Sequence, residues 1–188
     1  MTMHQVALRS GTPFDVETAN AALEAADPRD VLAHAVEHFD ALALSFSGAE
    51  DVVLVDMLAG IGDAVGIFCL DTGRLHAETL DFIDRVSAHY GLEIELMHPD
   101  AEAVEALVRE KGLFSFYEDG HQECCSIRKI EPLRRRLARA DAWITGQRRD
   151  QSPTRTNVPV VQHDGAFSSA ERTLVKYNPL AAWSSADV

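Results

Sequence analysis

The stretch ALALSFSGAEDVVLVDMLAGI, residues 41–61, combines a predicted strand, a short loop and a predicted helix. Its first part, ALALSF (41–46), is a short apolar run bounded by polar turn residues, which predicts a buried strand. SGAED then leads into an apolar segment that predicts a helix ending near Gly60–Gly62. A buried strand that runs directly into a helix is the first half of a βαβ unit.

The same alternation of strand and helix continues outward from this unit. Further strands are predicted over 64–70, 92–97, 142–146 and 158–162. Helices are predicted from Asp27-Pro28 onward, over 76–90 and 101–111, and from just after the Cys124-Cys125 pair through 130–140. The predicted fold class is therefore α/β, an open and mostly parallel sheet flanked by helices. We expect one domain over 1–188, with a loose leader over 1–14.

Composition excludes several classes of protein. No apolar run approaches the ~18–20 residues that span a bilayer, so no membrane association is expected. The N-terminus, MTMHQVALRS, lacks the features of a signal peptide, and three cysteines do not suit a secreted disulfide framework. The reducing cytoplasm is therefore the expected location. A net charge of −13 argues against nucleic-acid binding.

The charge is unevenly distributed. Between Arg128 and Arg155 nine basic residues stand against three acidic ones, in a chain that is acidic as a whole. A basic island of this kind indicates a local anionic ligand. The alternative is a solvated helix face, which we expect for some of the arginines over 134–139.

Parallel α/β sheets bind ligands at the carboxyl ends of their strands. This rule selects three loops, SGAED (47–51), DTGR (71–74) and GQRRDQSPTR (146–155). The first loop can present backbone amides and a helix N-terminus to a phosphate. It lacks the lysine of the Walker pattern, and an ordinary helix N-cap is the alternative interpretation.

Cys124 and Cys125 are adjacent, and Arg128 and Lys129 follow closely. Consecutive Cα atoms lie ~3.8 Å apart, below the usual disulfide range of ~4.4–6.8 Å, so a bond between the two thiols would be strained. The pair is either packed in a core or serves as reactive or metal-ligating thiolates, and the cationic neighbours favour thiolates. Cys69, in an apolar run, is expected to be a small buried hydrophobe.

Four stretches together resemble the sulfonucleotide reductases, and specifically the assimilatory adenylylsulfate reductases. They are SFSGAEDVVL (45–54), FCLDTGRL (68–75), EDGHQECCSIRKIEPL (118–133) and AWITGQRRDQSP (142–153). The resemblance runs from about residue 35 to the end of the chain. It implies a PP-loop fold of the adenine nucleotide alpha-hydrolase type, which is Rossmann-like. In this family a double cysteine separates the iron–sulfur enzymes from the cluster-free 3′-phosphoadenylylsulfate reductases.

The resemblance also implies roles for individual residues. Ser45, Ser47 and Gly48 would contact the nucleotide, with Glu50 and Asp51 continuing the loop. The remaining expected contacts are the Leu70 backbone on adenine, Gly73 at a close approach, Lys129 near the sulfate or the cluster, Gly146 at the ribose, and Arg148 and Arg155 on the last loop. The alternatives are a plain strand-ending turn at DTG and solvated side chains for the lysine and arginines.

In the family that this chain resembles, a 4Fe–4S cluster is bound by a cysteine pair and a downstream CxxC. Cys124 and Cys125 match the pair. A cysteine in a C-terminal ECGLH-like motif attacks the sulfur of adenylylsulfate and releases AMP. Thioredoxin then frees sulfite, as a step of sulfate assimilation and cysteine biosynthesis. The expected partners are thus adenylylsulfate or AMP and thioredoxin, and the resemblance allows for a homo-oligomer.

The sequence departs from that pattern, because no cysteine follows Cys125. Neither the CxxC nor the nucleophile is present in these 188 residues, so we expect the nucleophilic cysteine beyond Val188. We interpret the chain as a C-terminally truncated, nucleotide-binding core that is inactive alone. Three other functions stay open: a PP-loop ATP pyrophosphatase or adenylating enzyme, a 3′-phosphoadenylylsulfate reductase, and a non-catalytic nucleotide-binding module.

Overall fold

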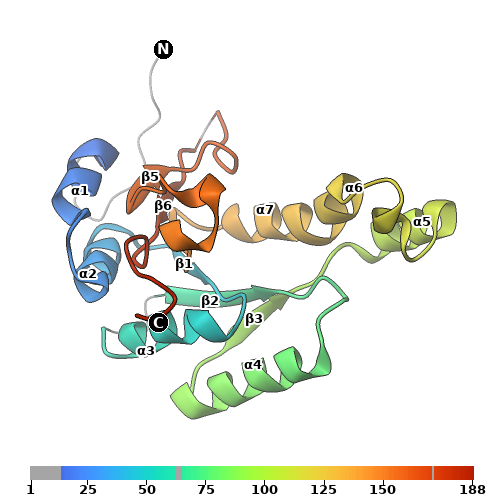
Figure 1. The fold of residues 1–188 in the computed structure, drawn as a ribbon, viewed down its shortest axis with the longest axis horizontal. Coiled ribbons are helices and arrows are strands. Elements are labelled where there is room, and N and C mark those ends of the chain that lie inside the picture. Colours follow the sequence, from blue (N-terminus) through green and yellow to red (C-terminus); the bar gives the residue numbers. More distant parts are fainter. Residues whose placement is uncertain (1–13, 62–64, 171) are drawn as a thin grey trace.

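The sheet predicted from the sequence is present in the computed structural model, which describes residues 14–61, 65–170 and 172–188. Its six strands lie in the order β3-β2-β1-β4-β6-β5 (Figure 1). Their bounds are β1 Leu42–Ser45, β2 Val65–Leu70, β3 Ile94–Met97, β4 Ala142–Ile144, β5 Val161–His163 and β6 Val175–Tyr177. All neighbouring strands pair in parallel except the edge strand β5, which runs antiparallel to β6. The predicted α/β class is confirmed.

Helices connect the strands and begin and end close to where the sequence indicates. They are α1 Val16–Leu23, α2 Pro28–His38, α3 Val52–Ala59, α4 Ala77–Tyr90, α5 Ala101–Lys111, α6 Gln122–Cys125 and α7 Glu131–Leu137. Asp27 and Asp100 accept hydrogen bonds from first-turn amides of α2 and α5, as N-caps do. Gly91, at φ 63°, ends α4 in the left-handed conformation that glycine adopts without strain.

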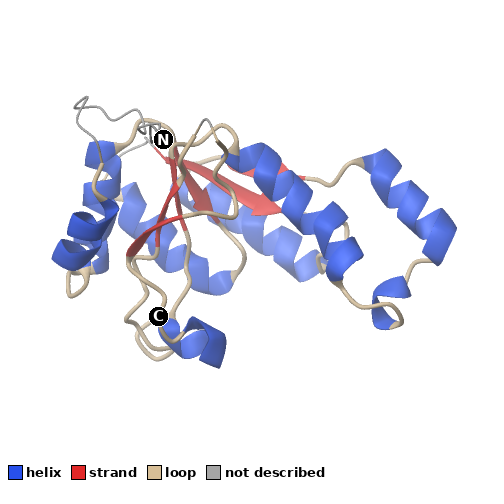
Figure 2. Cartoon of the chain, turned by 90° about the horizontal axis from the view of Figure 1, so that it is seen from above, coloured by secondary structure: helices blue, strands red, loops and turns tan. Residues whose placement is uncertain are grey.

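Helices cover both faces of the sheet (Figure 2). Because side chains alternate along a strand, Leu42 and Leu44 of β1 pack with α2 and α3, while Ala43 packs with α7. The face of the sheet that packs against α2 and α3 holds the larger buried cluster, which also contains side chains of α1 and α4. Burial on both faces explains why β1 and β2 are continuously apolar rather than alternating.

Four features differ from the sequence-based expectation. Helix α1 and strand β6 were not predicted, and β5 begins three residues later than the predicted 158–162 strand. Strand β6 has only three residues, too few for a periodic signal, and it forms because it pairs with both β4 and β5. The expected loose leader lies outside the described residues, except for Phe14.

The fourth difference concerns the cysteines. They do not precede a helix but lie within α6, which continues through a π-helical turn, Ser126–Ile130, into α7. In Figure 1 α5 and α6 lie at the end of the molecule opposite α1.

No helix in the described ranges is long and apolar enough to cross a membrane.

Candidate functional site

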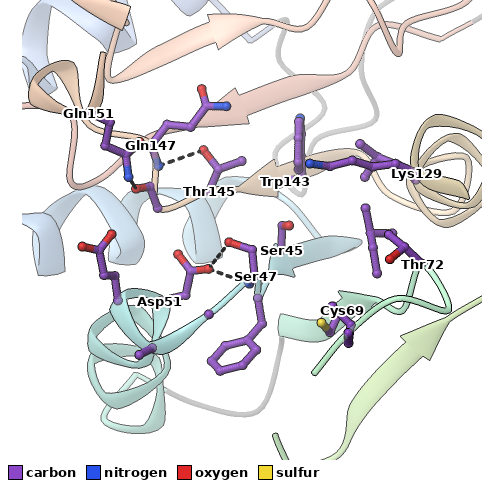
Figure 3. Close-up of a pocket in the computed structure, with 18 of the residues that line it drawn as sticks. Ser45, Ser47, Asp51, Cys69, Thr72, Lys129, Trp143, Thr145, Gln147 and Gln151 are labelled. Carbon is purple, nitrogen blue, oxygen red and sulfur yellow. Dashed lines mark hydrogen bonds between the residues drawn. The ribbon is translucent and has the colours of Figure 1, made fainter. Parts of the chain in front are cut away.

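A cavity of about 510 Å³ opens at the carboxyl edge of the sheet (Figure 3). It lies between β1 and β4, where the strand order reverses, because β2 lies on one side of β1 and β4 on the other. Open α/β sheets bind ligands at this position. The three loops selected from the sequence all line the cavity, through Gly48, Thr72, Gly146 and Arg155. The prediction of where a ligand binds therefore agrees with the position of the cavity.

The loop after β1 has the geometry of an anion cradle. Residues 49–51 form a 3-10 turn that continues into α3, and neither element has a side-chain cap. Amides at the start of this helical stretch can therefore face a ligand, where the helix dipole adds positive potential. The alternative of an ordinary N-cap does not hold. Ser47 is instead hydrogen-bonded to Asp51 through both its backbone N and its hydroxyl.

Asp51 fixes the shape of this cradle. Its Oδ2 accepts hydrogen bonds from Ser47 N at 2.6 Å and Ser47 Oγ at 2.7 Å (Figure 3). The side chain is buried, and burial raises the pKa of the carboxyl above its usual value. A Cβ on Gly146 would overlap Oδ1 of Asp51. Gly146 thus leaves the space that Asp51 fills, and the loops after β1 and β4 meet at this contact.

One part of the cavity wall is apolar. Phe46, Leu70, Leu75 and Leu133 line it, together with the thiol of Cys69. Burial raises the pKa of Cys69 to about 11, so this thiol stays protonated near neutral pH. Cys69 is therefore the inert buried residue that the sequence predicts. Apolar walls beside polar loops suit a ligand with a flat base and anionic groups.

Two cationic side chains also line the cavity. Lys129 comes from the π-helical turn and extends toward Trp143 in Figure 3. Arg155 comes from the short turn Pro153–Arg155 and donates a hydrogen bond to Gln151. Both belong to the basic island noted in the sequence. The cavity therefore combines amides, apolar walls and positive charge, the groups needed to bind a nucleotide.

Arg148 does not line the cavity. The residue is 1% exposed, and its guanidinium contacts both carboxylate oxygens of Glu50, at 3.0 and 3.2 Å. It also donates to Asp150 and to Ser185 Oγ. Charge-assisted contact with Arg148 lowers the pKa of Glu50. The structure therefore gives Arg148 protein partners, which join the loop after β1 to residues near 185, rather than the direct ligand contact expected from the sequence.

Gly73 is likewise outside the cavity wall, where Thr72 takes its place. Its φ of 70° requires glycine, and its N–H donates to Asp71 Oδ1 at 2.8 Å. The buried Arg128 donates to the Thr72 carbonyl at 2.8 Å. Gly73 thus shapes the turn after β2, so the plain-turn alternative describes its geometry better than a direct contact does.

The cysteine pair lies outside the cavity wall. Cys124 is half-buried and Cys125 is exposed, both as free thiols in α6. The preceding residue, Glu123, pairs with Lys111 at 2.5 Å. Within the described ranges no group of three or more His, Cys, Asp or Glu side chains converges as a metal site. The alternative of two thiols packed in a core does not hold, because Cys125 is exposed, but the described residues do not complete a four-thiolate site.

The segment that leads to Val188 is attached to the loop after β4. Ser185 N donates to Asp150 Oδ2 at 2.7 Å, and Arg148 donates to Ser185 Oγ at 3.1 Å. Val188 itself is 38% exposed and does not line the cavity. None of these contacts tests whether a nucleophilic cysteine lies beyond Val188, so that expectation stays a prediction.

Several residues of the cavity wall were not predicted. They include Phe46, Thr72, Trp143, Thr145, Gln147 and Gln151. The sequence contained a signal for three of these residues. Trp143, Thr145 and Gln147 are spaced two positions apart along β4 and just beyond it, so their side chains lie on the same face of the sheet. Thr145 donates to Asn178 Oδ1 at 2.6 Å, a contact across to the end of β6. That partner could not be foreseen while β6 was unrecognised.

Comparison with known proteins identifies the relatives of this chain. The Phosphoadenosine phosphosulfate reductase domain family matches residues 41–188. An adenosine 5′-phosphosulfate reductase of Pseudomonas aeruginosa is 56% identical over 187 residues, which cover 98% of this chain and 70% of the relative. A chloroplastic 5′-adenylylsulfate reductase of Arabidopsis thaliana is 54% identical over 172 residues, covering 89% of this chain and 38% of that protein.

Two solved structures share the fold of this chain. A phosphoadenylyl-sulfate reductase from Candida auris, in a phosphate complex, aligns with a TM-score of 0.72 and 25% identity over 92% of this chain and 81% of that one. An NH3-dependent NAD synthetase from Campylobacter jejuni aligns with a TM-score of 0.53 and 13% identity over 92% of this chain and 70% of that one. The second likeness concerns the fold alone.

Proposed function

The chain belongs to the phosphoadenosine phosphosulfate reductase family, and from that premise we propose that its cavity binds adenylylsulfate. The whole protein would reduce this substrate to sulfite and AMP in sulfate assimilation. The observation that carries the proposal is the convergence of an anion cradle, an apolar wall and two cations in one cavity between β1 and β4. The close relatives named as adenosine 5′-phosphosulfate reductases support the choice of substrate.

Each part of the substrate has a matching part of the cavity. The adenine base fits against Leu70, Leu75 and Leu133, where apolar surface leaves water on binding. The α-phosphate fits the uncapped turn over 49–51, whose amides and helix dipole favour an anion. The sulfate group would lie beside Lys129 and Arg155, because cations bind anionic oxygens through charge-assisted hydrogen bonds.

The reduction itself needs a thiolate that attacks the sulfur of the substrate, with AMP as the leaving group. None of the three cysteines suits that step. Cys69 has a pKa of about 11, and Cys124 and Cys125 are not part of the cavity wall. We therefore assign the nucleophile to a cysteine beyond Val188, and thioredoxin as the donor that releases sulfite from the sulfur–sulfur bond. The 188-residue chain by itself is then a substrate-binding core without reductase activity.

Cys124 and Cys125 are proposed as two of the four thiolate ligands of a 4Fe–4S cluster. Their partial exposure leaves the sulfurs accessible to a metal, and free thiols are what a cluster requires. Consecutive helical residues project ~100° apart around the helix axis. Both thiols can therefore reach one cluster only if the cluster lies beside α6, in the sector between the two side chains. The other ligands would have to come from outside the described residues.

Calorimetric titration tests the proposal directly. We expect adenylylsulfate and AMP to bind the 188-residue chain more tightly than 3′-phosphoadenylylsulfate. A chain that preferred the 3′-phosphorylated compound would instead be a 3′-phosphoadenylylsulfate reductase. Preference for ATP with Mg²⁺ would indicate an ATP pyrophosphatase or adenylating enzyme.

A further inference from the structure

Lys176 is a buried cation beside the cavity, and the binding residues proposed above do not include it. It lies in the middle of β6 with 8% of its surface exposed. Its Nζ donates to Gln147 Oε1 at 3.0 Å and lies 4.9 Å from the centre of the Trp143 ring. Both Gln147 and Trp143 line the cavity. Lys176 therefore stands directly behind the wall that the ligand would contact.

Among the described residues, no carboxylate forms an ion pair with Lys176. In the part of the chain that the structure describes, its polar and ring contacts are Gln147 and Trp143. Asp164 acts on it at longer range and is itself hydrogen-bonded to Trp143 Nε1 at 2.9 Å. Burial lowers the pKa of the Lys176 ammonium, and the Arg155 charge acts in the same direction. A buried ammonium without an ion pair is costly to the fold, which points to a role in the site.

The contact with Lys176 decides which way the Gln147 amide faces. An ammonium has three donors and no acceptor, so only the carbonyl oxygen of Gln147 can meet it. The NH₂ group must then occupy the other branch of the carboxamide. Figure 3 shows the oxygen turned away from Ser45 and Ser47 and the nitrogen on the side of Trp143. A glutamine without such a partner can present either group.

We infer that Lys176 is a positioning residue, which holds the Gln147 carboxamide so that its NH₂ group is available to an anionic oxygen of the ligand. The inference rests on the proposed function in one respect, that the cavity takes an adenine nucleotide. Gln147 then supplements Lys129 and Arg155 as a neutral donor in the same cavity. If the amide were reversed, its carbonyl oxygen would face the ligand anion and repel it.

A purely structural role makes different predictions. Lys176 could simply pack its aliphatic stem against Trp143. Methionine retains the length and apolar character of that stem and removes the ammonium, whereas arginine retains the donors. The substitution Lys176→Met should therefore be harmless if only packing matters, and harmful if the orientation of Gln147 matters.

The experiment measures binding of adenosine, AMP and adenylylsulfate to five proteins by calorimetry. They are the wild-type chain, Lys176→Met, Lys176→Arg, Gln147→Met and the double variant Lys176→Met with Gln147→Met. We expect AMP and adenylylsulfate to bind ~10-fold more weakly to both single Met variants, the loss of one hydrogen bond to a charged group. Adenosine, which has no phosphate, should bind all five alike, and Lys176→Arg should behave as wild type.

The double variant identifies the mechanism. If Lys176 acts through Gln147, removing both side chains should weaken AMP binding no further than removing either one. Additive losses would overturn the inference, and so would wild-type affinity in Lys176→Met or an equal loss for adenosine. If the wild-type chain bound neither AMP nor adenylylsulfate, the proposed function would fail first and the inference with it.

Thermal unfolding controls for the fold, and Gln147→Glu adds a second line of evidence. A carboxylate at 147 would pair with Lys176, so the melting temperature should be maintained or rise. The same carboxylate would repel an anionic ligand, so AMP affinity should fall by at least ~10-fold. A Gln147→Glu protein that kept wild-type AMP affinity would show that residue 147 does not face the anion, and would also overturn the inference.

Discussion

The cavity proposed to bind the nucleotide and the cysteine pair are two candidate functional regions that are built in different ways. The cavity is enclosed by three loops that lie far apart in the sequence and converge at the carboxyl edge of the sheet. The pair lies on one short helix, with Cys125 exposed and no further metal-binding side chains converging on it within the described ranges. The proposed nucleotide site thus draws all its lining residues from this chain, whereas the proposed cluster would draw only two of its four thiolates from it.

The difference shows what a parallel sheet contributes to a site. Parallel strands bring their carboxyl ends to one edge, so Ser45, Leu70 and Gly146 meet there irrespective of their separation in sequence. A helix places only its own neighbours together, and consecutive residues point in different directions. Binding of the nucleotide should therefore be independent of the cysteines, while metal binding should depend on residues from elsewhere.

The largest expected effect is the absence of turnover. The 188-residue chain supplied with adenylylsulfate, thioredoxin and dithiothreitol should release no sulfite above a protein-free control. The reason is that no cysteine in the cavity wall can act as the nucleophile, since Cys69 has a pKa of about 11. Sulfite release that disappeared in Cys124→Ser or Cys125→Ser would show that the pair is catalytic, and the two regions would then be one.

The iron content of the 188-residue chain tests whether its cysteine pair can hold a cluster without further ligands. After incubation with iron and sulfide and then desalting, the chain should retain no 4Fe–4S cluster, because the described residues supply two thiolates. Iron and sulfide analysis, together with visible absorption, measures this. Cys69→Ala should give the same result as wild type. Four irons per chain, lost in Cys124→Ser, would mean that the cysteine region is complete after all.

Substitution of Gly146 should damage the cavity alone. A Cβ in Gly146→Ala would displace the Asp51 carboxylate and the Ser47 hydrogen bonds with it. We expect AMP affinity to fall by at least ~10-fold, because the displaced loop would no longer hold its amides in place for the phosphate. The matched control is Gly165→Ala, where a Cβ meets no atom within 4 Å. Equal AMP affinity in both variants would show that the Asp51–Gly146 contact does not shape the site.

A smaller effect concerns Cys69 and the pH dependence of stability. The folded-state pKa is raised to about 11 from 9.0, so between these pH values the unfolded chain has already lost the proton that the folded chain keeps. Stability therefore falls as pH rises from about 9 to 11, by ~2 kcal/mol. Denaturant unfolding should show a fall that is ~2 kcal/mol larger in wild type than in Cys69→Ala, because buried Tyr177, whose pKa is also raised, contributes equally to both proteins. Parallel curves for the two proteins would contradict the assigned burial.

Much of the fold could be predicted from the sequence. Helix α5 was predicted with its bounds, because Asp100 and the Gly112 that follows the helix mark its ends. Strand β6 could not be predicted, because its three residues gain their stability from pairing with β4 and β5 rather than from their own pattern.

The candidate site was predictable to a similar extent. Sequence and resemblance located Ser47, Gly48, Lys129 and Gly146, all of which line the cavity. Arg148 was placed with the ligand because an arginine on a loop gives no sign of its partner. Only the fold brings it to Glu50, 98 positions away. The sequence alone could therefore not predict which side chains from distant segments meet in the fold.

The separation of the two regions is tested most directly by titrating AMP into the 188-residue chain freed of metal. We expect one AMP to bind per chain, with the same affinity in wild type and in the Cys124→Ser, Cys125→Ser double variant. Gly146→Ala should show strongly weakened binding in the same buffer. Loss of AMP binding on removal of the two thiols, or on removal of metal, would contradict the claim that the nucleotide site is complete without the cysteine pair.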